Sequence, residues 1–238
     1  MPSDSDVSRI LIVTAHPDDV DFGAAGSIAH WTERGIDVAY CIVTDGDAGG
    51  FDPATPRSEI PAIRRAEQTA AAKTVGVSEL HFLAYPDGRV QSTIELRRDI
   101  TRVIRIVRPD RVVTQSPDRN FARIQASHPD HLAVGEAALC AVYPDARNPF
   151  AHPELASEGL EAHVVPEVWL MASPSSDRAV DITDTVDRKI SALRCHVSQL
   201  PNPDAIEPLI RNWGAAMAAS AGLSEGRLAE MFQVIDTA

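Results

Sequence analysis

Hydrophobic and polar positions along this chain divide it into short apolar runs and longer stretches of helical periodicity. The apolar runs are rich in β-branched residues and predict buried strands at 10–14, 38–44, 81–84, 111–114 and 168–172. The periodic stretches predict helices at 23–33, 59–75, 93–107, 129–142 and 183–197. Beyond residue 200 we expect a final helix or two and a strand near 232–235.

The alternation of strands and helices predicts an α/β fold of the Rossmann-like kind, with a mostly parallel sheet covered by helices on both faces. We expect a single domain over 1–238, because a chain of 238 residues can bury a sizeable core and shows no internal repeat. The polar segment 1–8 is expected to be a flexible N-terminus. The stretch 143–167 has little periodicity, which predicts a long excursion on the active-site side.

Composition and charge narrow the classes of function. The net charge of −12 argues against a primary role on nucleic acid, which needs a positive surface. The chain has no run of eighteen apolar residues, so we expect no membrane span. It also lacks a signal-like N-terminus, and its three widely spaced cysteines do not suggest disulfides, so a reducing cytoplasm and buried, inert thiols are expected.

Acids and histidines follow several predicted strands, at the sheet edge where such folds bind ligands. The segment Ala15-His16-Pro17-Asp18-Asp19 follows the first strand. Imidazole nitrogen and carboxylate oxygen are both zinc ligands. Adjacent residues in an extended loop point in opposite directions, so one of Asp18 and Asp19 can bind a metal with His16 while the other faces a bound water.

A second segment, Ser127-His128-Pro129-Asp130-His131, stands where the helix after the fourth strand begins. Pro129 fits the first turn of a helix, and His128 and His131, three residues apart, then lie close together. One of them can complete a site of two histidines and one carboxylate, with the other beside it. Three protein ligands and an open position are what a catalytic zinc site requires.

These motifs resemble those of the PIG-L/LmbE family of zinc-dependent N-deacetylases, which includes N-acetylglucosaminyl-inositol and bacillithiol-pathway deacetylases. The resemblance rests first on Ala-His-Pro-Asp-Asp-Val-Asp-Phe-Gly-Ala-Ala-Gly at 15–26 and His-Pro-Asp-His at 128–131. Supporting stretches at 64–67, 85–88 and 229–232 occur in the same order as in the family. The resemblance therefore covers nearly the whole chain.

The resemblance implies a zinc-dependent hydrolase with an LmbE-like fold that removes an N-acyl group, acetyl first of all, from an amino-sugar-type small molecule. It implies that His16, Asp19 and His131 bind zinc. Zinc lowers the pKa of a bound water toward about 7. Asp18 would then be the general base as this water attacks the amide, and His128 would stabilise the oxyanion.

By the same resemblance, Asp130 would orient His128, and Arg64 and Asp87 would lie in the substrate pocket. Ala126 departs from the family, because some members have at this position a tyrosine that serves the oxyanion. We expect a small-molecule substrate, no nucleic acid or membrane partner, and a possible homo-oligomer.

Other functions stay open at this level. A metal phosphoesterase would use clustered aspartates and histidines to hold two ions, so metal stoichiometry would separate it from an amidase. The substrate could instead be a thiol conjugate, and a zinc-binding module without turnover is a third alternative. A dinucleotide site is disfavoured, because the first strand leads into His-Pro-Asp-Asp and not into Gly-x-Gly-x-x-Gly.

Overall fold

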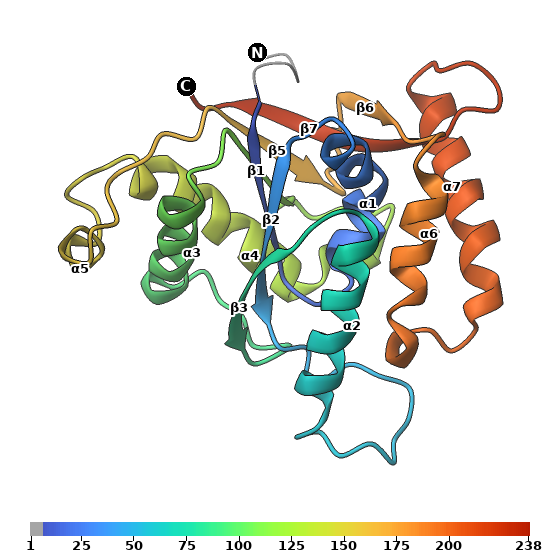
Figure 1. Ribbon diagram of the computed structural model, residues 1–238, viewed down its shortest axis with the longest axis horizontal. Coiled ribbons are helices and arrows are strands. Elements are labelled where there is room, and N and C mark those ends of the chain that lie inside the picture. The colour runs from blue at the N-terminus through green and yellow to red at the C-terminus, as the bar shows by residue number, and fades with distance from the viewer. Residues whose placement is uncertain (1–6) are drawn as a thin grey trace.

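The apolar runs of the sequence form the parallel part of one seven-stranded sheet, with strand order β3-β2-β1-β4-β5-β7-β6. A computed structural model describes residues 7–238 (Figure 1). The strands are β1 (Arg9–Thr14), β2 (Asp37–Thr44), β3 (Glu79–Tyr85), β4 (Arg111–Gln115), β5 (Glu167–Met171), β6 (Arg178–Asp181) and β7 (Ala229–Asp236). The five strands β3, β2, β1, β4 and β5 run parallel to one another. β7 is antiparallel to both of its neighbours, β5 and β6.

Helices cover both faces of the sheet and make a three-layer sandwich, which confirms the predicted fold class (Figure 1). The α-helices are α1 (Asp19–Thr32), α2 (Ile60–Thr74), α3 (Ile94–Val107), α4 (Pro129–Cys140), α5 (Pro153–Ser157), α6 (Val186–Arg194) and α7 (Ile206–Ser220). Shorter helical turns are η2 (Ile124–Ser127), η3 (Ala141–Ala146), η4 (Val197–Gln199) and η5 (Pro203–Ala205). Apolar residues of α1, α2 and α6 pack on one sheet face, those of α3 and α4 pack on the other, and α7 packs on α6.

The strand order places the two histidine motifs next to each other. β1 pairs with β4, and from this pair the chain builds outward in opposite directions to β2 and β5. Such a switch point opens a crevice at the carboxyl ends of the two central strands. The loop 15–18 leaves β1 at that edge, and the segment 116–128 leaves β4 beside it.

The prediction that 143–167 lies on the active-site side is wrong. Because α4 begins at the carboxyl edge of the sheet and runs back, the segment after it emerges near the amino edge. There the His163 Nε2 atom lies 2.8 Å from the carbonyl oxygen of Pro109, just before β4 begins. Arg105 of α3 donates to backbone carbonyls of the same stretch, at 3.1 Å to Asp145 and 3.0 Å to Asn148.

The short strand β6 is not predicted by the sequence pattern, because four residues with mixed exposure carry almost no periodic signal.

The expectation of buried thiols holds for one cysteine only. The cysteines form no disulfide in the structure, but only Cys41 is buried, and Cys140 and Cys195 are partly exposed. Residues 1–6 of the expected flexible segment 1–8 lie outside the described residues. Within 7–238, no helix has the length and apolar character needed to cross a membrane.

Gly135 sets how closely α4 approaches the end of β4. A Cβ atom at this position would lie 2.3 Å from the carbonyl oxygen of Gln115 and 3.0 Å from the nitrogen of Pro117. We expect Gly135→Ala to lower the free energy of unfolding by about 2–3 kcal/mol, because backbone atoms must move and this outweighs the roughly 1 kcal/mol of added helix propensity. Urea unfolding measures the change. Glu136→Ala, at an exposed position of the same helix, is the control, and an equally stable Gly135→Ala variant would refute the packing argument.

Candidate active site

The loop after β1 presents Asp18 in a strained conformation. Asp18 has φ of 97°, a region that aspartate tolerates better than most residues but still at a cost. It caps α1, yet its carboxylate makes no capping hydrogen bond to the helix. The backbone N–H of Asp18 donates to Gln68 Oε1 at 2.8 Å. The side chain of Asp18 is thereby left to face the crevice.

The three predicted ligands, His16, Asp19 and His131, bring their donor atoms together. His16 Nδ1 lies 3.2 Å from His131 Nε2 and 3.2 Å from Asp19 Oδ2. His131 Nε2 lies 3.0 Å from the other carboxylate oxygen of Asp19, Oδ1. Metal–ligand bonds near 2.0–2.1 Å in a tetrahedron separate neighbouring ligand atoms by roughly 3.3 Å. The three side chains are therefore spaced closely enough to hold one zinc ion together.

His16 is oriented by carboxylates on its other nitrogen. Its Nε2 atom lies 3.0 Å from Asp87 Oδ1 and 3.2 Å from Asp130 Oδ2. Asp130 is fully buried and also accepts from the backbone N–H groups of Gly88, at 2.7 Å, and Val90, at 3.1 Å. A proton on Nε2 leaves the lone pair on Nδ1, which points at Asp19 and His131. This is the usual arrangement of a metal-bound histidine.

The electrostatics of the cluster also suit a cation. Burial by itself would lower the pKa of His16, but Asp19, Asp130 and Asp87 together raise it to about 12. The local charge is therefore dominated by aspartates. A divalent cation would be stabilised by the same negative charges. The residues present fit a bound metal ion.

Two other donor groups lie within 4.8 Å, namely His16 with His128 and His131, and His16 with Asp87 and Asp130. The contacts disfavour both. The second group would use His16 Nε2, which already faces both carboxylates. In the first group, the backbone N–H of Asp130 donates to His128 Nδ1 at 3.2 Å, so a neutral His128 carries its proton on Nε2.

His128 is thus arranged as a hydrogen-bond donor. Burial lowers its pKa, and the neighbouring His16 and His131 lower it further, which favours the neutral ring. The expectation that Asp130 orients His128 through its carboxylate is corrected here. The carboxylate of Asp130 contacts His16, and only the backbone N–H of Asp130 contacts His128.

The carboxyl group of Asp18 lies beside this cluster and has a raised pKa. Burial raises its pKa and Asp19 adds to the rise, while Arg64 opposes it, giving a value of about 6. A carboxylate with this pKa is ionised at neutral pH and is a stronger base than an exposed aspartate. Its Oδ2 atom lies 3.3 Å from Arg64 Nη2.

Arg64 is almost fully buried and does not face open solvent. Its guanidinium donates to the carbonyl oxygens of Pro17, at 2.5 Å, and Gly46, at 3.1 Å, and lies 3.8 Å from Asp87. The loop after β2 leaves room for it, because a Cβ atom on Gly46 or Gly49 would come within 2.5 Å or 2.4 Å of Arg64 Nη1. The contacts seen here make Arg64 a support for Asp18 and Asp87. Contact of Arg64 and Asp87 with substrate stays a prediction.

Two glutamines that hold the site were missed by sequence reasoning. Gln115, at the end of β4, donates to Asp19 Oδ2 at 3.0 Å and accepts from the backbone N–H of Ala15 at 2.9 Å. Gln68 of α2 holds the Asp18 backbone and donates to Asp21 Oδ2 at 2.8 Å. The sequence signal that could have identified Gln115 is a polar residue at the carboxyl end of a buried strand. For Gln68 it is a polar residue on the inner face of a helix.

The three-layer α/β fold thus carries, at the switch point of its sheet, a cluster of histidines and aspartates that fits a metal ion. Comparisons with known proteins identify the family. The model of the family described as PIG-L, GlcNAc-PI de-N-acetylase, matches residues 11–142. This chain belongs to the PIG-L family and is an enzyme of the N-deacetylase class.

The relatives and solved structures agree with this assignment. The chain is 32% identical to diacetylchitobiose deacetylase of Thermococcus kodakarensis, covering 87% of this chain and 76% of that protein. It is 30% identical to a probable N-acetyl-alpha-D-glucosaminyl L-malate deacetylase 2 of Bacillus cereus, covering 80% and 83%. The structure of N,N'-diacetylchitobiose deacetylase from Pyrococcus horikoshii superposes with a TM-score of 0.89 at 29% identity, covering 98% of this chain and 85% of that one.

Proposed function

We propose that this chain is a zinc-dependent deacetylase that hydrolyses the acetamide of a small N-acetylated amino sugar. The observation that carries the proposal is the triangle of His16 Nδ1, Asp19 and His131 Nε2 with the carboxylate of Asp18 beside it. The relatives support the substrate class, because they are named for acetylated chitobiose and N-acetylglucosaminyl compounds. The proposed domain is the whole of 1–238.

In this proposal His16, Asp19 and His131 hold the zinc ion. When bound, zinc supplies polarisation of the amide carbonyl and a lowered pKa for water. Asp18 takes a proton from the attacking water, since its carboxylate is ionised at neutral pH and lies beside the ligands. The Nε2–H of His128 donates to the oxygen that gains negative charge, a contribution of roughly 3–4 kcal/mol for a donor of this kind. The leaving nitrogen receives its proton from Asp18 or from His128.

The supporting residues keep Asp18 and His16 in place while this happens. Gln68 fixes the strained Asp18 backbone, and Arg64 balances the charge of its carboxylate. Asp87 and Asp130 hold the His16 ring and keep its proton on Nε2. The reacting groups therefore need little rearrangement when substrate arrives.

Release of free amine tests the proposal. The purified protein is offered N-acetylglucosamine and N,N'-diacetylchitobiose, with zinc and with chelator, and its metal content is determined in parallel. We expect amine and acetate in equal amounts, only in the presence of metal, with one zinc per chain. Two ions per chain, or a metal-loaded protein that leaves both sugars intact, would contradict the proposal.

A further inference from the structure

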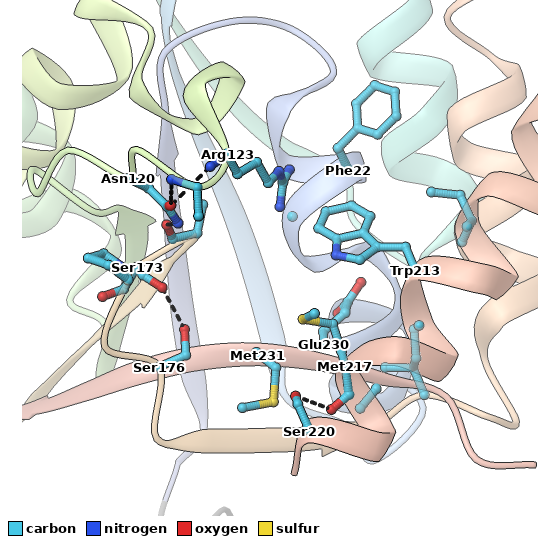
Figure 2. A pocket seen from close by; sticks show the side chains of 18 of the residues that line it. Phe22, Asn120, Arg123, Ser173, Ser176, Trp213, Met217, Ser220, Glu230 and Met231 are labelled. Carbon is cyan, nitrogen blue, oxygen red and sulfur yellow. Dashed lines mark hydrogen bonds between the residues drawn. The ribbon is translucent and has the colours of Figure 1, made fainter. Parts of the chain in front are cut away.

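A cavity of about 460 Å³ lies between α1, α7, β7 and the loop after β4 (Figure 2). None of the residues that line it belongs to the metal cluster. It is nevertheless close to that cluster, because its lining residue Gly23 stands one turn along α1 from Asp19. The same sheet edge thus carries two separate sites, the cluster after β1 and β4 and this cavity after β4 and β5.

The cavity has the composition of a small-molecule site. One wall is apolar and includes Phe22, Trp213, Met217 and Met231 (Figure 2). The opposite side carries a few polar side chains, such as Asn120 and Ser173 from the loops after β4 and β5. Ligand pockets typically measure about 300–1,000 Å³ and combine an apolar lining with a small number of polar groups.

The charges at the cavity leave one cation uncompensated. Lys189 and Glu230 are both buried there but form an ion pair of 2.5 Å, so they cancel. The guanidinium of Arg123 stacks over the Trp213 ring at 4.1 Å. Within residues 7–238 no carboxylate pairs with Arg123, and burial lowers its pKa without any acidic group opposing the shift.

Arg123 is held in position by its own loop. The backbone N–H groups of Ala122 and Arg123 both donate to Asn120 Oδ1 at 3.1 Å. The N–H of Asn120 in turn donates to Ser127 Oγ at 2.7 Å, which closes the loop. These bonds order the backbone of the loop, while the guanidinium of Arg123, an exposed residue, is positioned by its stacking on Trp213, so it loses less freedom when it binds an anion than an unstacked one would.

We propose that this cavity binds a small amphipathic carboxylate, with the carboxylate on Arg123 and an apolar body against Trp213 and Met217. A single guanidinium offers two parallel N–H donors, which match one carboxylate. One uncompensated positive charge balances one negative charge, which favours a monoanion over a phosphate dianion. The site lies outside the metal cluster and does not depend on the deacetylation reaction.

Binding of 4-phenylbutyrate, followed by tryptophan fluorescence, tests the proposal on the zinc-supplied protein. Trp213 is the partly exposed tryptophan at the cavity, whereas Trp31 and Trp169 are buried in the core. We expect a saturable change in emission that Trp213→Phe abolishes. Arg123→Ala should raise the dissociation constant about tenfold, because a charge-assisted hydrogen bond is lost.

Matched controls keep the test specific. Arg211→Ala removes a guanidinium on α7 that pairs with Glu207 and Asp187 and does not line the cavity, and this variant should bind as the parent does. The neutral amide 4-phenylbutyramide should bind at least about tenfold more weakly than the acid. No saturable change, equal binding by Arg123→Ala and the parent, or equal binding of amide and acid would each overturn the proposal. All readouts are independent of turnover, so they stand whether or not the chain deacetylates amino sugars.

Discussion

Asp18→Asn is expected to reduce the turnover number for deacetylation about a thousandfold, because an amide cannot accept the proton of the attacking water. The substitution keeps the size of the side chain, and asparagine tolerates the positive φ of 97° at this position. The proposed zinc ligands are untouched, so the metal content should stay at one ion per chain. Steady-state kinetics on an acetylated amino sugar, together with metal analysis, measures both quantities.

The control for Asp18→Asn is Asp118→Asn, which changes an exposed acid in the loop after β4 that lies outside the cluster. It should retain parental turnover. A metal-loaded Asp18→Asn enzyme with parental turnover would show that another group serves as the base. Loss of both turnover and metal would instead show that Asp18 acts as a ligand.

His131→Ala is expected to weaken zinc binding by more than about a hundredfold, since loss of a partner that only orients a ligand already costs about 10–100-fold. The remaining His16 and Asp19 would give a two-ligand site. Turnover should vanish at metal concentrations that saturate the parent. Competition with a chelator of known affinity measures the dissociation constant.

Two further histidine variants serve as controls for His131→Ala. His81→Ala removes a histidine that pairs with Glu79 on β3 and should leave zinc affinity unchanged. His128→Ala should lose turnover but keep zinc. If His128→Ala lost zinc as His131→Ala does, the ligand set would have to be the group of His16, His128 and His131.

The meeting of His16, Asp19 and His131 could be predicted, because both motifs follow strands that end at the same edge of the sheet. That these three residues bind zinc stays a prediction. His16 and Asp19 lie on one tight loop, and the parallel pairing of β1 and β4 places the second motif beside the first. The contacts that orient those ligands could not be predicted in the same way. Whether Asp130 faces His16 or His128 depends on its rotamer, and on the backbone N–H groups of Gly88 and Val90, which come from a distant part of the chain.

In the fold, too, some features could be predicted and others could not. Runs of β-branched residues predict the buried strands, and helical periodicity predicts the helices. The side of the sheet on which 143–167 lies follows from chain direction, since a segment leaving the carboxyl end of α4 returns near the amino edge. Length and composition of that stretch carry no information about direction, which is why the prediction from them was wrong.

The position of β7 has a consequence for how the protein is made. β7 is the last described element to be translated, yet it lies between β5 and β6 and not at the margin of the sheet. Its Glu230 also accepts from the backbone N–H groups of Gly26, at 3.1 Å, and Ser27, at 2.7 Å, inside α1. A nascent chain on the ribosome therefore exposes the unpaired edges of β5 and β6 until residues 229–236 have emerged, and such edges invite association with other chains. We therefore expect a chain that terminates before β7 to carry both histidine motifs and yet to aggregate.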